Sequence, residues 1–87
     1  MRPLGYQQLS GISVATALTI PAGAAKALIS VETNNVRWRD DGTAPTATVG
    51  QLLKTTDPEL LYLDGGLGAM QFIPVTSTAT VNVTYYG

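Results

Sequence analysis

Hydrophobic and polar residues alternate along several short stretches of the chain, and a period of two residues is typical of half-buried β-strands. Ala79–Tyr86 alternates most regularly, with Ala, Val, Val and Tyr against Thr, Asn, Thr and Tyr. Ala25–Thr33 places Ala27, Ile29 and Val31 on one face in the same way. We therefore predict two strands in these stretches, each with one face toward the core.

The remaining apolar stretches are shorter or less regular, and turn residues separate them. Met1–Ser10 is a mixed segment that is expected to pair with a sheet edge, and Gln51–Thr55 fits a strand or a loop. Thr56–Glu59 contains residues that begin helices, but we predict a turn there, before a short strand at Leu60–Leu63. Further strands are predicted at Ile12–Ile20, Val36–Arg39 and Met70–Val75. In the first of these, Val14, Leu18 and Ile20 lie on one face. In the last, Pro74 marks a sheet edge or the end of pairing.

Turn residues link these stretches. The short Asn34-Asn35 link makes Ala25–Asp40 a candidate hairpin. The sum is seven or eight short antiparallel strands and no long helical pattern, which predicts an all-β fold. We expect one domain over residues 1–87, a small β-sandwich or a jelly-roll-like barrel. The other turns are predicted at Pro21–Gly23, Asp40–Gly42, Gly65–Gly68 and Thr76–Thr78.

The stretch Val36–Thr46 contains the only Trp of the chain and its clearest turn signal. Trp38 is predicted to anchor its strand in the core, since it alternates with two arginines. Asp and Gly tolerate the backbone conformations of a tight turn, and proline fixes an extended exit. The residues assigned to this turn and its exit are Asp40, Asp41, Gly42 and Pro45.

Arg37 and Arg39 lie on the same face of that strand, about 7 Å apart by strand geometry. Two arginines at this spacing are suited to a carboxylate of a neighbouring subunit; the alternative is a solvated polar face beside the Trp. Tyr86, which points outward from the last strand, is a third candidate interface residue. Asp40 and Asp41 are interpreted as turn residues, with Asp40 paired to an arginine. A Ca²⁺ site is disfavoured because adjacent strand residues point to opposite faces.

Composition narrows the functional class. The 87-residue chain has no Cys and no His, so we predict no disulfide, no metal, no cofactor and no catalytic residue. A net charge of −1 with 13% charged residues provides no basic stripe for nucleic acid. No apolar run is long enough to cross a membrane, and no secretory signal is visible, so assembly in the host cytoplasm is expected. Because a domain this small gains buried area by oligomerisation, the expected partners are other proteins or copies of itself.

Residues 36–50, VRWRDDGTAPTATVG, resemble a motif of small tailed-bacteriophage and prophage proteins. Leu18–Ala24, Gln71–Ile73 and Val81–Tyr86 are similar to segments around the motif in those proteins, whereas Lys54–Leu61 matches least. The resemblance implies a structural protein of the virion. Within that class the leading hypothesis is a capsid decoration or cement protein bound to the major capsid protein. The alternatives are a tail or head–tail junction protein bound to tail proteins, and a receptor- or carbohydrate-binding module.

Overall fold

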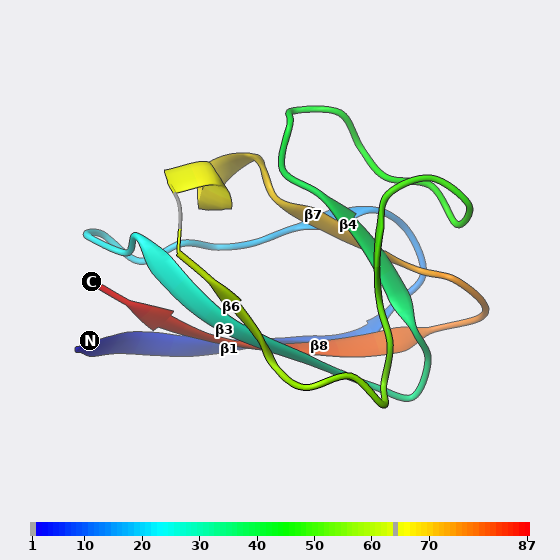
Figure 1. Ribbon diagram of the computed structural model, residues 1–87, viewed down its shortest axis with the longest axis horizontal. Helices are drawn as coiled ribbons and strands as arrows, with labels where there is room; N and C mark the ends of the chain where they lie inside the picture. The colour runs from blue at the N-terminus through cyan, green and yellow to red at the C-terminus, as the bar shows by residue number, and fades with distance from the viewer. Residues whose placement is uncertain (1, 64) are drawn as a thin grey trace.

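In the computed structural model, which describes residues 2–63 and 65–87, the strands stack in two layers (Figure 1). The first sheet has the strand order β1 (Pro3–Ile12), β8 (Ala79–Tyr86), β3 (Lys26–Glu32) and β6 (Leu60–Tyr62). The second sheet has the order β2 (Thr16–Ala17), β7 (Gln71–Pro74), β4 (Val36–Arg39) and β5 (Gln51–Leu53). A 3₁₀ helix, η1 (Gly65–Ala69), precedes β7, and all strand pairs are antiparallel.

The core lies between the two sheets because the central strands point alternate side chains inward. On β8 the odd-numbered residues are buried and the even-numbered ones are partly exposed. The facing strands of the second sheet contribute Val36 and Phe72, both without solvent exposure. The largest fully buried side chains are Tyr85, Phe72, Ile29, Met70, Val36, Val81 and Val83.

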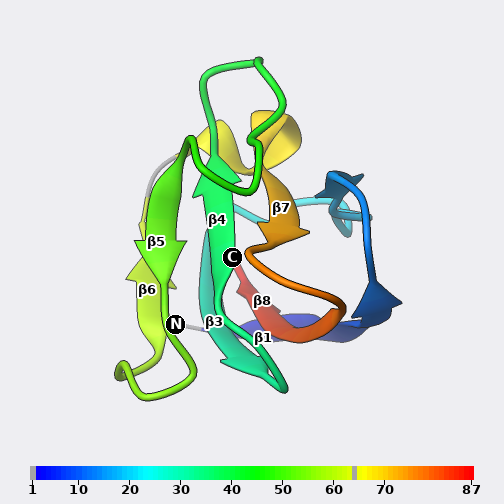
Figure 2. The same cartoon turned by 90° about the vertical axis from the view of Figure 1, so that its right-hand side faces the viewer.

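The all-β sandwich is confirmed, and the strands predicted at Ala25–Thr33, Val36–Arg39, Met70–Val75 and Ala79–Tyr86 correspond to β3, β4, β7 and β8. Thr56–Glu59 is a turn before a short strand, as predicted, and Gln51–Leu53 is a strand. The barrel alternative is not adopted, because each sheet keeps two end strands (Figure 2).

The strand predicted at Ile12–Ile20 is wrong, and the mixed segment before it forms the longest strand. β1 begins at Pro3 and pairs with β8 over its length, with bulges between Pro3 and Gly5 and between Leu9 and Ile12. The chain then leaves the first sheet, so Val14 is 66% exposed and only Thr16–Ala17 pairs with β7. Because β1 has few buried residues, its alternation is weak in the sequence, and its pairing partner is distant along the chain.

The candidate hairpin over Ala25–Asp40 is also wrong, since β3 and β4 belong to different sheets. Thr33 takes a left-handed conformation, with φ of 78°. Asn34 then donates its side-chain amide to the carbonyl of Thr78 at 2.7 Å, and the carbonyl of Asn35 accepts the amide of Val75 at 2.9 Å. This corner carries the chain from one layer to the other.

Candidate interaction surface

Residues 36–50 form β4 and a loop that folds back against it. Arg37 links the two parts: its Nε donates to the carbonyl of Ala47 at 3.1 Å, and its Nη1 donates to the carbonyl of Gly50 at 3.0 Å. Both acceptors are main-chain oxygens of the loop, so the guanidinium closes the loop onto the strand that carries it. The interface role of Arg37 stays a prediction, and any partner would meet a side chain that already has two acceptors in its own chain.

Gly50 and Pro45 show how closely the loop approaches β4. A Cβ atom at Gly50 would lie 3.1 Å from the carbonyl oxygen of Trp38 and 3.2 Å from the Cβ atoms of Arg37 and Pro45. Gly50 also has a φ of 140°, which side chains rarely adopt. Pro45, which is predicted to fix the exit of the turn, is buried. The motif is therefore a compact structural unit.

Asp41, and not Asp40, pairs with an arginine. Arg39 donates Nε to Oδ1 of Asp41 at 3.0 Å and Nη2 to Oδ2 at 2.5 Å, a bidentate pair on the surface. The hydrogen bond from Arg39 holds the pKa of the Asp41 carboxyl below its ordinary value, and Asp41 raises the pKa of Arg39. Oδ1 of Asp41 also accepts the amide of Thr43, and Gly42 has a φ of 87°. These features are those of the predicted turn.

Asp40 instead accepts a hydrogen bond from the hydroxyl of Tyr62, which lies on β6 of the other sheet. The ring of Tyr62 meets Trp38 edge to face, with ring centroids 6.1 Å apart and planes at 89°. Trp38 is partly buried and packs at the margin of the core. Trp38, Tyr62 and Asp40 thus join the two sheets on the side where β5 and β6 lie (Figure 2).

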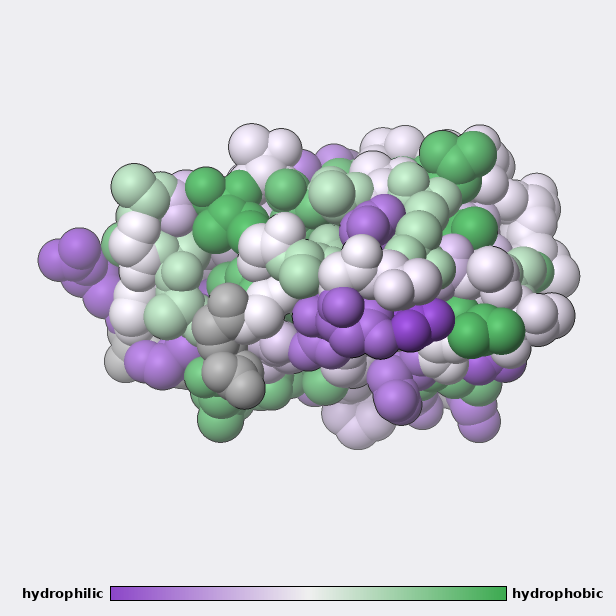
Figure 3. Space-filling model, turned by 90° about the horizontal axis from the view of Figure 1, so that it is seen from above, coloured by the Kyte–Doolittle hydropathy of each residue, from purple (hydrophilic) through white to green (hydrophobic). Residues whose placement is uncertain are grey.

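A depression of about 400 Å³ lies beside this turn and is lined by Arg39, Asp40, Asp41, Val49, Gly50 and Gln51. Its three charged side chains all have partners within the chain: the Arg39–Asp41 pair, and Tyr62 for Asp40. Figure 3 views the molecule from above and shows a hydrophilic group near the middle of this face, with neutral and hydrophobic residues around it and further hydrophilic residues toward the edges. The charged residues that line this depression therefore stabilise the turn and its contact with β6, and their charges are already paired within the chain.

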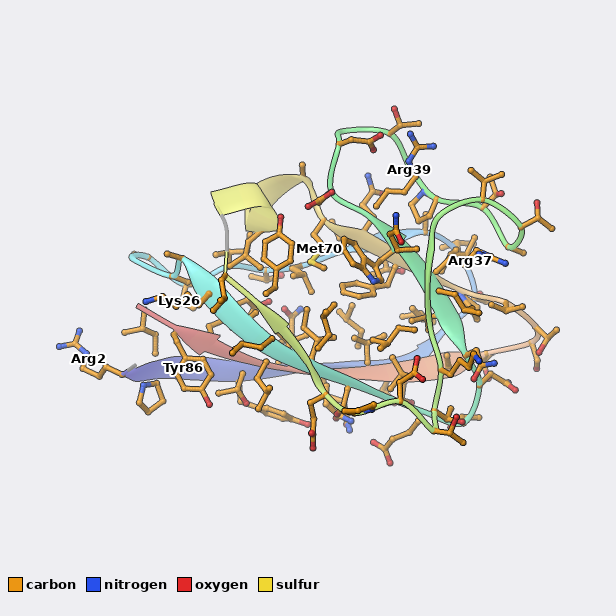
Figure 4. The ribbon with its side chains drawn as sticks, in the orientation of Figure 1. Arg2, Lys26, Arg37, Arg39, Met70 and Tyr86 are labelled. Atoms are coloured by element: carbon orange, nitrogen blue, oxygen red, sulfur yellow. The ribbon has the colours of Figure 1, made fainter. Side chains whose placement is uncertain are left out.

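Tyr86 does not share a surface with the two arginines. It lies on β8 in the first sheet, whereas Arg37 and Arg39 lie on β4 in the second, and Figure 4 shows them in opposite layers. The structure thus brings Arg37 and Arg39 to one side of the molecule and leaves Tyr86 on the other.

The outer face of the first sheet, defined by the side chains that point away from the core, extends across four strands. One row in register across it consists of Tyr6, Thr84, Leu28 and Leu61. Tyr6 is 63% exposed and Leu61 is 43% exposed. Sequence reasoning misses this row because the residues of β1 fit only a mixed segment, and a row across four strands depends on their register. The alternation of β8 was the available signal, since it marked the even-numbered residues as outward.

The polar side of the outer face is a connected hydrogen-bond network centred on Asn82. Its Oδ1 accepts the hydroxyl of Tyr6 at 2.6 Å and Nε2 of Gln8 at 2.9 Å. Its Nδ2 donates to Oε2 of Glu32 at 2.8 Å. The other charged residue of this face, Lys26, donates to the carbonyl of Gly87 at 3.2 Å. The outer face therefore combines exposed Tyr and Leu side chains with amide and hydroxyl groups, and Glu32 and Lys26 on it both have hydrogen-bond partners.

A second depression, of about 310 Å³, lies beside Tyr6 and is lined by Gly5, Tyr6, Gln7, Thr19, Ile20, Pro21 and Tyr85. Within it, Oε1 of Gln7 accepts the hydroxyl of Tyr85 at 2.6 Å and the amide of Thr19 at 3.0 Å. Burial raises the pKa of Tyr85 above its ordinary value. Its phenol therefore stays a neutral hydrogen-bond donor through the physiological range.

No protein-family model, curated protein or solved structure matches the chain at a significant level. Among the described residues, no helix has the length and hydrophobicity needed to cross a bilayer. In the same part of the chain, no three Asp or Glu side chains gather in a way that would hold a metal ion.

Proposed function

We propose that this protein is a non-enzymatic structural component of a phage-type virion, and specifically a capsid decoration protein that binds the assembled shell. The observation that carries the proposal is the outer face of the first sheet. The motif at residues 36–50 supports the virion class, and the outer face supports binding to another protein.

The outer face has the chemistry of a protein-binding surface. Exposed Tyr and Leu side chains supply contact area, and the Asn82 network supplies hydrogen bonds at its polar side. Tyr adds area at a small entropy cost because it has only two side-chain torsions. A protein that binds the assembled shell and not its free subunits shifts the equilibrium toward the intact particle, and a cement protein stabilises the shell in this way.

The test is binding to shells that lack the protein, with a matched pair of charge insertions. Leu61→Asp places a charge on the outer face, and Val14→Asp places the same charge on the bend after β1, where Val14 is also exposed. We expect Leu61→Asp to lose most shell binding and Val14→Asp to retain it, while both unfold at the denaturant concentration of the original protein.

Copy number separates the two virion positions. A decoration protein occurs in numbers set by the shell lattice, whereas a tail or head–tail junction protein occurs in a few copies set by the tail symmetry. Quantitative gel analysis of purified particles against a known standard measures this number. Absence of the protein from particles would overturn the virion proposal altogether.

A second candidate, a carbohydrate-binding module, is favoured by one observation. Tyr6 is exposed beside the 310 Å³ depression, with the amide side chains of Gln8 and Asn82 nearby. An aromatic ring flanked by amides suits a sugar. Binding on a glycan array that Tyr6→Ala abolishes and Leu61→Asp leaves intact would favour this candidate over shell binding.

A further inference from the structure

Four strands end the two sheets in the part of the chain that the structure describes, and they differ greatly in length. β2 has two residues, while β5 and β6 have three each. β1 has ten and pairs on one side only, with β8. Short end strands are one way in which proteins prevent edge-to-edge pairing, and charged side chains are another. β1 has neither protection, since Pro3–Ile12 contains no charged residue.

The middle of β1 is regular enough to pair again. Its bulges lie between Pro3 and Gly5 and between Leu9 and Ile12, so Gly5–Leu9 keeps an unbroken register with Val81–Tyr85 of β8. Five residues of strand extend about 17 Å. Bulges at both ends twist the strand away from a partner and thereby limit added pairing to this segment.

The hydrogen bonds at the C-terminal end of β8 show which main-chain groups of β1 face away from β8. The carbonyl of Tyr86 accepts from Ala25 on the β3 side, and the amide of Gly87 donates to the carbonyl of Arg2 on the β1 side. Because the direction alternates along a strand, the odd-numbered residues of β8 face β1. Their register partners are the odd-numbered residues of β1, which leaves the N–H and C=O of Tyr6 and Gln8 at the free edge.

We propose that Gly5–Leu9 pairs with the same segment of a second copy, antiparallel and about a two-fold axis at Gln7. This register places Tyr6 opposite Gln8 of the other copy, and the two symmetry-related pairs exchange about four main-chain hydrogen bonds. Two identical antiparallel strands are self-complementary, which an isologous dimer requires. The segment carries no charge, so the two copies meet without like-charge repulsion.

The pairing joins the two first sheets into one continuous eight-stranded sheet, and the two outer faces become one surface. The exposed Tyr6 rings of both copies then lie near the centre of that surface. This inference concerns the isolated protein and does not depend on the proposed virion function. A dimer that fails to bind shells would leave it standing.

The first experiment measures mass in solution by sedimentation equilibrium. We expect twice the 9.1 kDa of one chain. Gln8→Pro removes an outward N–H, which β1 does not use to pair with β8, and Gln8→Lys adds an edge charge while keeping the backbone. Both should shift the mass to one chain. Ser30→Lys, which adds the same charge on the interior strand β3 of the same face, should leave the dimer intact.

The second experiment uses the absence of Cys from the chain to fix the register by disulfide formation. Tyr6→Cys with Gln8→Cys places a Cys opposite a Cys at about 5.5 Å between Cα atoms, within disulfide reach. The single variant Gln8→Cys places its two copies diagonally, about 7–8 Å apart, beyond that reach. We expect covalent dimer from the double variant and little from the single one.

Three results would overturn the proposal. The first is a monomer at the highest soluble concentration of the original protein. The second is a dimer that survives both Gln8→Pro and Gln8→Lys. The third is a dimer that Leu61→Cys on β6 crosslinks while the double variant on β1 does not, because the pairing would then use the opposite edge of the sheet.

Discussion

Replacing Arg37 with Met tests whether the loop of the 36–50 motif is held by its own strand. Met keeps most of the apolar stem and removes the guanidinium, so packing along the stem is largely preserved. The two lost hydrogen bonds are those to the carbonyl of Gly50, which is partly buried, and to the carbonyl of Ala47, which is exposed. The loop should loosen from β4 while the sheets remain formed.

The magnitude follows from the two bonds. A hydrogen bond from a charged donor contributes about 1.5 kcal/mol or more when it is shielded, and an exposed one about 0.5 kcal/mol. We therefore expect the free energy of unfolding to fall by about 2 kcal/mol. For a domain of this size that corresponds to a melting temperature lower by about 10 °C. The acceptors are uncharged carbonyls, so the loss should change little with ionic strength.

Urea denaturation followed by fluorescence measures this change, because the only Trp lies on the same strand as Arg37. Arg39→Met is the matched control, since it removes an exposed ion pair from the next outward position and should leave the midpoint unchanged. Hydrogen exchange of the amides in residues 43–50 should accelerate in Arg37→Met alone. Equal stabilities for the two variants, with unchanged exchange in the loop, would refute the reasoning.

Two further predictions concern the same loop and the buried phenol. Gly50→Ala should destabilise the protein by more than about 2 kcal/mol, because the added Cβ meets the main-chain carbonyl oxygen of Trp38. Gly42→Ala meets no atom within 4 Å and should cost only about 1 kcal/mol, from the strain of a left-handed conformation. Similar urea midpoints for the two variants would contradict the close approach of the loop to β4. The raised pKa of Tyr85 means that its neutral form contributes stability that is fully present below pH of about 10 and is lost as pH rises through the folded pKa. Tyr85→Phe should flatten that alkaline loss in a titration of stability against pH, and an unchanged slope would show that another group is responsible.

The sequence predicts β3 and β8 most directly, because the alternation within each of these strands records a buried face. β3 and β8 each bury every second residue, so the pattern is complete within the segment. β1 buries only Leu9 and Ile12 among its ten residues, and it is a strand because β8 pairs with it from the other end of the chain. Such a pairing depends on residues near the other end of the chain, which no local pattern encodes.

The candidate hairpin failed for a related reason. A two-residue Asn link between two apolar stretches predicts a tight return within one sheet. Val31 and Val36 are both buried, however, and they enter the core from different sheets. The Asn34-Asn35 corner between them is hydrogen-bonded to residues Val75 and Thr78. The partners of Arg37 were equally out of reach, because Ala47 and Gly50 belong to a loop without periodicity.

The motif at residues 36–50 and the surface proposed to bind a partner lie on different sheets. Residues 36–50 need their residue types for local reasons: Arg37 closes the loop, Gly50 permits its approach, and Asp41 holds the turn. The outer face of the first sheet is built from Thr, Asn, Tyr and Leu, which many sequences supply at outward strand positions. We therefore expect proteins that share the motif to share the β4 loop and to differ in the row from Tyr6 to Leu61. Under the proposed function, exchanging that row between two such proteins should transfer shell specificity, whereas exchanging residues 36–50 should not.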